Sequence, residues 1–472
     1  MSQFNFSSSI SFLLVLFLCS CAGNQNPNDQ SLPLSIEEAE ILPADTNDLV
    51  VLKSSLNSNY YEPGQTENFR YLYLEVSTKP FEIKNEERKP LNICLVIDRS
   101  GSMGGDKLAF VKDAAVFVLE NLNSSDFLSI VSYDDEVVTE WASGNVKDKT
   151  AIRSKIEQLF DRGGTNLGGG LLQGYNEVKT NFSQDYTNRV LLLTDGLANE
   201  GITDPIELNK IARMMNVENG ISLSTFGVGV DYNEDLLQSM AENGAGNYYF
   251  IESPEDIPSI FKDELDGLLR VLAQNTLLEI ELPQGVKVDR VFGFKYEQEK
   301  TNLKIHFRDL TADDTKGVLV KMSVASDANQ DLSFSSKLKY TLAVEDYATK
   351  DLTINTVLQP THDTSVISES RSKTVEQWVT FYEANYNIEK AMAEADKGNY
   401  DHAKSLLELN GDYLKSRNYS WGASVYTIKI EAQNSSYDSA IIEMEEMEEE
   451  IKKSVQKDFK SKNYYMKTRK SK

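Results

Sequence analysis

The sequence predicts an α/β fold: a doubly wound, mostly parallel sheet, inserted in or followed by an antiparallel β-sandwich, with a helical region at the C-terminal end. Three observations favour this fold. Residues 91–97 and 189–193 are nearly unbroken apolar runs of strand length, typical of parallel strands buried on both faces. Residues 106–122 carry apolar side chains at helical spacing, as expected of a helix that packs on such a sheet. After residue 272, short strand-like segments alternate with turns.

The first apolar run ends at Asp98, and the loop that follows carries two serines. Asp98-Arg99-Ser100-Gly101-Ser102 leads from this strand into the helix over residues 106–122, so we expect Ser100 and Ser102 to lie in the turn between them. Alternate residues of one loop can point at one ion. An ordinary helix-capping turn is the simpler interpretation of this stretch alone, because Asp and Ser are favoured there for local hydrogen bonds.

Two further segments bring oxygen atoms to the same edge of the predicted sheet. Asp195 follows Thr194 at the end of the second apolar run, and Thr165 opens a third helix after Gly163-Gly164. Ligands of open α/β sheets gather at the carboxyl ends of the strands. The three segments together offer two carboxylates and three hydroxyls, from Asp98, Asp195, Ser100, Ser102 and Thr165. Because Mg2+ takes about six oxygen ligands and keeps some water, this set predicts a divalent-metal site with one position open to a second molecule.

This arrangement resembles the von Willebrand factor type A domain, including the inserted domain of integrins, over residues 88–272. The metal-ion-dependent adhesion site of that family uses an Asp-x-Ser-x-Ser stretch, a later Thr and a later Asp. The resemblance implies that Ser100, Ser102 and Thr165 are direct ligands of Mg2+, with Mn2+ or Ca2+ possible. It implies that Asp98 and Asp195 act mostly through bound water. A protein partner would complete the shell with an acidic side chain.

The same resemblance extends to the end of the domain. It implies that residues 231–237 and 244–251 belong to the last helix and strand. Residues 254–272 would form the final helix, whose shift on ligand binding would reach the next domain. Arg99 stands where integrin-type domains carry a small or apolar residue, and Arg162 precedes the glycine pair. These arginines either place positive charge at the mouth of the site or, as is more usual, are solvated.

The N-terminal end predicts export and lipid anchoring. The apolar run over residues 12–18 is too short to span a bilayer but suits a signal peptide. Leu18-Cys19-Ser20-Cys21 resembles a bacterial lipobox, which implies a lipoprotein signal peptide over residues 1–21 and lipid on Cys21. Residues 1–9 lack Lys and Arg, so a plain signal peptide is the alternative. Residues 22–45 are expected to be a flexible tether, and Cys94 is expected to be a core residue in a strand.

The rest of the chain predicts a second and a third region. Residues 273–360 contain five strand candidates typical of an antiparallel β-sandwich: 276–282, 303–307, 318–324, 337–344 and 352–358. Residues 46–87 include the strand candidate 71–76, which we expect to join that sandwich, because an isolated hairpin is only marginally stable. Residues 370–457 are expected to be helical, with a hairpin over 376–396 and 402–409 that resembles half of a tetratricopeptide repeat. Residues 442–453 are expected to be a solvated acidic helix face and residues 458–472 a basic tail.

Composition and missing motifs exclude several function classes. The 472 residues, with a hydrophobic fraction of 40%, suffice for two or three folded domains. A formal net charge of -25 argues against nucleic acid as a partner. The three histidines, His306, His362 and His402, all lie outside the predicted metal domain, so a serine nucleophile there has no local base. The stretch after Gly101 fails as a phosphate-binding loop at its mechanistic positions. We therefore expect no enzyme; a metal hydrolase is the remaining catalytic alternative, without a visible general base.

These features predict a lipid-anchored cell-envelope protein that binds a protein ligand through a divalent cation. The membrane would be reached through Cys21, on the periplasmic or the cell-surface side. The chain also resembles bacterial proteins labelled as calcium-activated chloride channel homologues. An accessory, non-pore subunit of an envelope transport or channel assembly is therefore the alternative, because no apolar run after residue 21 approaches the length of a membrane span.

Overall fold

The computed structural model describes residues 42–46, 49–66, 68–81, 88–307, 309–344, 348–444, 447 and 449–468. Residues 39–472 belong to one compact unit. The expected signal peptide, Cys21 and most of the expected tether lie outside the described residues. Within the part of the chain that is described, no helix is both long and apolar enough to cross a membrane.

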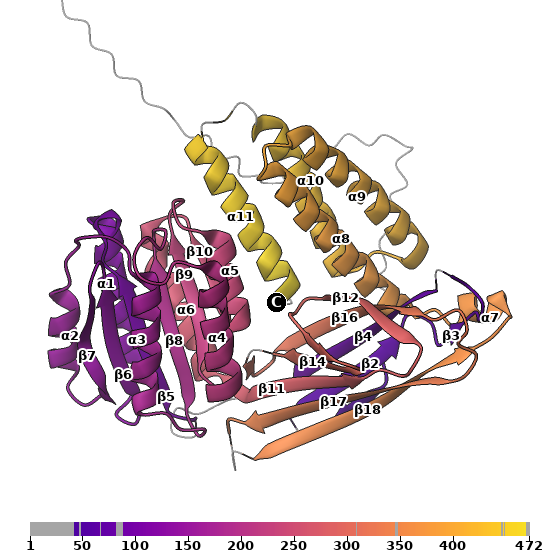
Figure 1. Cartoon of the computed structure of the whole chain (residues 1–472), viewed down its shortest axis with the longest axis horizontal. Coiled ribbons are helices and arrows are strands. Elements are labelled where there is room, and N and C mark those ends of the chain that lie inside the picture. Colours follow the sequence, from indigo (N-terminus) through magenta and orange to yellow (C-terminus); the bar gives the residue numbers. More distant parts are fainter. Residues whose placement is uncertain are drawn as a thin grey trace, which may run out of the picture. The chain divides into compact units, whose positions relative to one another are not determined.

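The central sheet has six strands in the order β10-β9-β8-β5-β6-β7 (Figure 1). Its strands are β5 (Leu91–Asp98), β6 (Phe127–Tyr133), β7 (Val137–Asn145), β8 (Thr187–Thr194), β9 (Ser222–Val228) and β10 (Ala245–Ile251). All neighbouring pairs are parallel except β6 and β7. The predicted mostly parallel sheet is confirmed, with both apolar runs at its centre.

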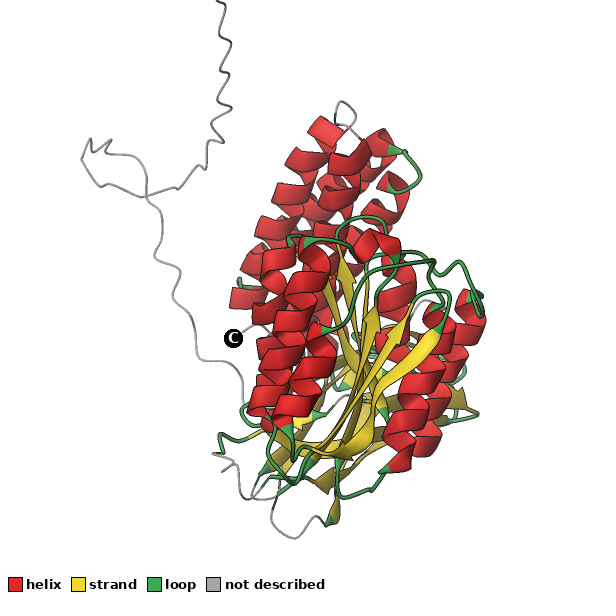
Figure 2. Cartoon of the chain, turned by 90° about the vertical axis from the view of Figure 1, so that its left-hand side faces the viewer, coloured by secondary structure: helices red, strands yellow, loops and turns green. Residues whose placement is uncertain are grey.

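Helices cover both faces of this sheet (Figure 2). One face packs on α1 (Asp106–Asn121), α2 (Lys149–Glu157) and α6 (Ile257–Leu269); the other packs on α3 (Leu167–Thr180), α4 (Pro205–Asn219) and α5 (Glu234–Asn243). In β5, Ile93 and Leu95 join the first core, whereas Cys94 and Val96 join the second. Burial, which outweighs the other influences on the group, raises the pKa of the Cys94 thiol to about 12, as suits a core residue.

Two further sheets share a second core and form the β-sandwich. One has the order β1-β2-β4-β16-β12. Its strands are β1 (Ala44–Thr46), β2 (Val50–Leu56), β4 (Phe69–Thr78), β16 (Thr315–Val324) and β12 (Val286–Phe292). Strand β4 contains the expected segment 71–76 and pairs with β16 over nine residues. The parallel-sheet domain is therefore inserted into the β domain.

The second sheet of the sandwich has the order β13-β14-β11-β17-β18-β3, with β15 beside β11. Its strands are β13 (Glu297–Glu299), β14 (Asn302–His306), β11 (Val271–Glu281), β17 (Leu332–Leu342), β18 (Thr349–Pro360), β3 (Tyr60–Tyr61) and β15 (Leu310–Thr311). Only Arg270 separates α6 from β11, so the inserted domain runs directly into the middle of this sheet.

The C-terminal region is helical for longer than the sequence predicted. It contains α7 (Thr364–Glu369), α8 (Lys373–Ala395), α9 (Tyr400–Trp421), α10 (Val425–Met444) and α11 (Glu449–Thr468). The second helix of the expected hairpin thus reaches Trp421. The expectation of a free tail is wrong for residues 458–468, because α11 continues through them and Tyr464 is buried against the inserted domain.

Candidate metal centre

Asp98 is the innermost residue of the candidate site. It is the last residue of β5 and is fully buried. Its Oδ1 accepts a hydrogen bond from the backbone N–H of Ser100 at 2.8 Å, and its Oδ2 accepts one from Thr194 Oγ1 at 2.6 Å. Burial raises the pKa of Asp98 to about 6, although the hydrogen bonds from Thr194 and Ser100 act in the opposite direction. The carboxylate therefore ties the loop after β5 to the end of β8.

Ser100, Ser102 and Asp195 form a continuous hydrogen-bonded chain of oxygen atoms. The two serine hydroxyls lie 3.2 Å apart, and Ser102 Oγ donates to Asp195 Oδ1 at 2.7 Å. Met103, which ends the short 3-10 helix Gly101–Met103, is fully buried and fixes this loop to the core. Ser102 is exposed, whereas Ser100 and Asp195 are buried, so the chain of oxygens reaches from the interior to the surface.

Thr165 reaches the same point from the loop before α3. A Cβ atom built on Gly196 would lie 3.5 Å from Thr165 Oγ1 and 3.8 Å from Ser102 Oγ, so both hydroxyls border the space above Gly196. The Thr165 backbone N–H donates to Asn199 Oδ1 at 2.8 Å, and the N–H of Gly101 donates to the carbonyl of Gly163 at 3.2 Å. The structure therefore brings together all five residues that the sequence singled out.

Lys107 is a close neighbour of this set that the sequence reasoning missed. It lies in the first turn of α1, and its Nζ is 2.5 Å from Asp195 Oδ2. In the sequence, this lysine stands in the stretch after Gly101 that does not match a phosphate-binding loop. Its place in the helix that follows the Asp-x-Ser-x-Ser loop was the available signal. Thr194 and Asn199 were also missed as residues that orient Asp98 and Thr165.

The two arginines beside the site have a structural role. Arg99 is buried, with its Nη2 3.0 Å from Asp134 Oδ2, and Arg162 Nε lies 2.7 Å from the same oxygen. Arg162 Nη2 also pairs with Glu136 at 2.5 Å. Both expectations for Arg99 are wrong, because this arginine is neither solvated nor an unpaired positive charge at the entrance of the candidate site. Asp134 neutralises it beneath the loop.

The donor set fits a hard cation. Its oxygen atoms come from two carboxylates and three hydroxyls on three loops, which is the chemistry that Mg2+ prefers. Soft or imidazole-rich sites have a different signature, and no group of three or more His, Cys, Asp or Glu side chains that could hold a metal occurs among the described residues. The space above Gly196, which a Cβ would enter, borders two of the hydroxyls. Asp98, Ser100, Ser102, Thr165 and Asp195 are thus the residues that could hold such an ion.

Comparisons with known proteins agree with the fold of the inserted domain. A family model of the von Willebrand factor type A domain matches residues 92–263. The uncharacterized protein YfbK of Escherichia coli is 32% identical over 246 residues, which cover 51% of this chain and 42% of that protein. The chain therefore spans less than half the length of this relative.

Two solved structures share the fold at low identity. A von Willebrand factor type A protein from Catenulispora acidiphila superposes with a TM-score of 0.62 at 15% identity, covering 80% of this chain and 89% of that one. The ArnB paralog VWA2 from Sulfolobus acidocaldarius superposes with a TM-score of 0.60 at 16% identity, covering 89% of this chain and all of that one. The resemblance seen in the sequence is confirmed: this chain contains a von Willebrand factor type A domain, at residues 92–263.

Proposed function

We propose that the chain is a lipid-anchored cell-envelope protein that binds a protein ligand through a divalent cation held by its type A domain. Domains of this type commonly mediate protein–protein interaction and adhesion. The convergence of five oxygen-bearing side chains at the carboxyl ends of β5 and β8 is the observation that carries the proposal. Ser100, Ser102 and Thr165 would be the direct ligands, with Asp98 and Asp195 behind them.

The ion would supply positive charge for an acidic side chain of the partner. Asp98 and Asp195 already bond to groups of the chain, namely Ser100 N, Thr194, Ser102 and Lys107. Such bonds hold the hydroxyls in place, which lowers the cost of arranging them around a cation. We propose binding without catalysis, with Mg2+ as the preferred ion and Mn2+ or Ca2+ as alternatives.

Calorimetric titration of the purified chain with Mg2+ and Mn2+ tests the metal site. We expect binding by the native chain and its loss in Asp195→Ala and Ser102→Ala, since each removes one oxygen ligand or support. Asp113→Ala, an exposed carboxylate on α1 outside the site, is the matched control and should leave the titration unchanged. A folded native chain that takes up no divalent ion at millimolar concentration would overturn the proposal.

Pull-down from solubilised envelopes tests the partner. We expect capture that is lost with chelator and with Asp195→Ala but not with Asp113→Ala. Equal capture in every condition would show that the partner binds elsewhere on the chain.

Lipid on Cys21 is tested by incorporation of labelled palmitate in growing bacteria. We expect label in the native chain and none in Cys21→Ser, with a matching shift of the protein out of the membrane fraction. An unlabelled native chain would favour the plain signal peptide.

A further inference from the structure

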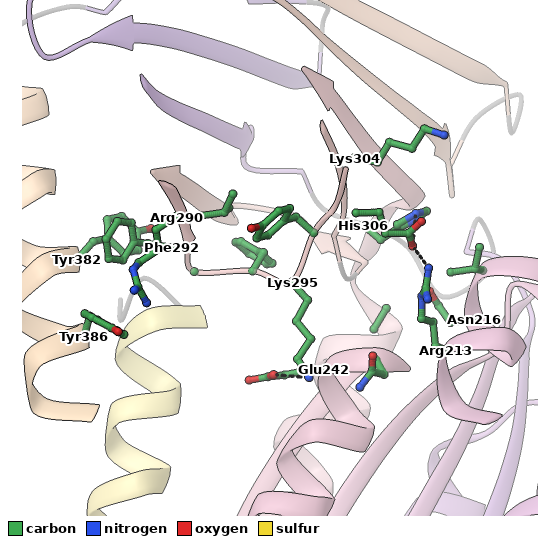
Figure 3. Close-up of a pocket in the computed structure, with 18 of the residues that line it drawn as sticks. Arg213, Asn216, Glu242, Arg290, Phe292, Lys295, Lys304, His306, Tyr382 and Tyr386 are labelled. Atoms are coloured by element: carbon green, nitrogen blue, oxygen red, sulfur yellow. Dashed lines mark ion pairs between the residues drawn. The ribbon is translucent and has the colours of Figure 1, made fainter. Parts of the chain in front are cut away.

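A second candidate site lies where α4 and α5, the sandwich and α8 meet. A cavity of about 420 Å³ is lined there by residues of all three parts of the chain (Figure 3). Cavities of this size between domains are where proteins commonly bind small ligands. The lining contains none of the five residues of the metal centre, so this site is independent of the proposed function.

Most cations of this cavity are already neutralised. Arg213 pairs with Glu297 at 2.5 Å, Lys295 with Glu242 at 3.4 Å, and Lys304 with Glu299 at 3.0 Å. Figure 3 shows Arg213, which extends from α4, and Lys295, which extends from the loop after β12. Such pairs are expected in a chain of net charge -25, where acidic side chains outnumber basic ones.

Arg290 is the exception in this lining. Its guanidinium carbon lies 3.8 Å from the centre of the Tyr386 ring, and no carboxylate of the described residues lies within ion-pair distance of it. The ammonium of Lys390, likewise without a carboxylate partner among the described residues, lies 4.3 Å from the centre of the same ring. Stacking on a ring leaves the edge of a guanidinium able to hold a carboxylate with two hydrogen bonds. The cavity thus offers an anion-binding group beside an aromatic wall.

The neighbouring residue of α8 adds an unmet hydrogen-bond acceptor. Asn385 is only 3% exposed, and its Oδ1 has no hydrogen-bond donor among the described residues. Buried polar atoms are nearly always paired, so an orphan of this kind in a cavity wall indicates a missing donor. Tyr382, Asn385 and Tyr386 all line the cavity at helical spacing, and Phe292 faces them from β12.

We propose that this cavity binds a small organic carboxylate with an aromatic or apolar body and an N–H or O–H donor. The carboxylate would pair with Arg290, the body would pack against Phe292 and Tyr386, and the donor would satisfy Asn385 Oδ1. Each part of this ligand matches one feature of the wall, namely a cation without a carboxylate partner, the pair of aromatic rings that line the cavity, and a buried acceptor without a donor.

Calorimetric titration of the purified chain with two matched probes tests the inference. N-acetyl-L-phenylalanine carries all three features, whereas its amide lacks only the negative charge. We expect the acid to bind in the millimolar range or tighter and the amide to bind about tenfold more weakly, the loss of one charge-assisted hydrogen bond. Equal binding of acid and amide, or no heat from the acid at millimolar concentration, would overturn it.

Variants then locate the site. Arg290→Gln should weaken binding of the acid about tenfold, and Arg290→Lys should retain part of the affinity. The matched control is Lys295→Gln, which removes a cation that Glu242 already neutralises and should leave the affinity unchanged. An equal loss in Arg290→Gln and Lys295→Gln would show a general charge effect and contradict the assignment. Thermal unfolding of each variant distinguishes lost binding from lost folding. Asn385→Leu removes the acceptor for the ligand's N–H or O–H donor, so it should weaken binding independently of Arg290.

Discussion

At the scale of single residues, the contact between Lys107 and Asp195 matters most for the candidate metal centre. An ammonium lies 2.5 Å from one oxygen of a carboxylate whose other oxygen accepts from Ser102. A lysine in this position neutralises Asp195 when no other cation is near. It also opposes a divalent ion, since like charges a few ångströms apart repel even near the protein surface.

We therefore expect Lys107→Met to bind Mg2+ and Mn2+ more tightly than the native chain. The removed repulsion is on the order of 1–2 kcal/mol, or about tenfold in affinity. Manganese titration followed by electron paramagnetic resonance measures the change. Lys112→Met is the control, because Lys112 lies on the same helix but bonds the carbonyl of Glu157 instead. Weaker binding in Lys107→Met would instead show that the lysine holds Asp195 in place.

At the scale of elements, α3 approaches the sheet more closely than a side chain would allow. A Cβ on Gly174 would lie 2.4 Å from Val96 Cγ2, and one on Gly170 would lie 2.5 Å from the ring of Tyr133. Val96 lies in β5, which ends at Asp98, and Tyr133 is the last residue of β6. The glycines of this helix therefore set the distance between the sheet and Thr165, which lies in the loop just before the helix.

Gly174→Ala should destabilise the chain by about 1–3 kcal/mol, because the new methyl overpacks a core with no room for it. Gly267→Ala is the opposite case, since nothing lies within 4 Å of its Cβ position in α6. That substitution should stabilise the chain by up to about 1 kcal/mol through helix propensity. Urea unfolding measures both, and a neutral Gly174→Ala would contradict the tight packing.

Helix α11 docks on the inserted domain through ion pairs and aromatic contacts. Lys457 Nζ lies 2.5 Å from Glu234, Lys460 lies 2.9 Å from the same carboxylate, and the N–H of Tyr248 donates to Tyr464 Oη at 3.3 Å. Burial alone would raise the pKa of Glu234, but Lys460 and Lys457 outweigh it and lower the pKa to about 2. Glu234 therefore stabilises the docked helix in its charged form.

The pH dependence follows from the sign of this shift. A carboxylate with a lowered pKa in the folded chain contributes stability above its unfolded value near 4.5, and that stability is lost as pH falls towards about 2. We expect hydrogen exchange in α11 to speed up, after correction for intrinsic rates, over this range. Glu234→Gln should loosen α11 already at neutral pH. Asp235→Asn, which removes an exposed partner of Lys460, should have little effect. Similar exchange in all three chains would contradict the proposed role of Glu234.

At the scale of the whole molecule, one buried ion pair joins the inserted domain to the sandwich. Arg189, in β8, is 3% exposed and lies 2.5 Å from Asp309, which follows β14. Burial raises the pKa of Asp309, although Arg189 acts in the opposite direction. Arg189 also acts on Glu264 of α6. It lowers the pKa of that carboxyl group, whereas burial acts in the opposite direction.

Asp309→Asn should destabilise the chain by about 3–5 kcal/mol, because it leaves the arginine charge buried without its partner. The double variant Arg189→Met with Asp309→Leu should recover only part of that loss, since it removes both charges of the pair but also takes the arginine away from the buried Glu264. Thermal unfolding of the two variants and the native chain measures this difference. A double variant that is less stable than the single one would show that the pair contributes net stability.

The sequence predicted the parts of this molecule that depend on local patterns. Apolar runs located β5 and β8, and the polar residues that end them located Asp98 and Asp195. The docking of α11 could not be predicted in this way. Its buried residues include Lys457, whose partner Glu234 lies 223 positions earlier in the chain. The sequence of a polar helix predicts a solvent-exposed helix until the surface that pairs with its charges is known. The position of Lys107 escaped prediction for the related reason that its partner comes from another loop.

The single-residue link at Arg270 has a mechanical consequence. Tension applied to a ligand held at the rim of the inserted domain would leave that domain through its two connections to the sandwich, of which the C-terminal one is β11, flanked by β14 and β17. Drawing such a strand along its own axis strains all its ladder bonds at once, whereas peeling an edge strand breaks them one after another. A link built in this way would resist shear between the inserted domain and the sandwich.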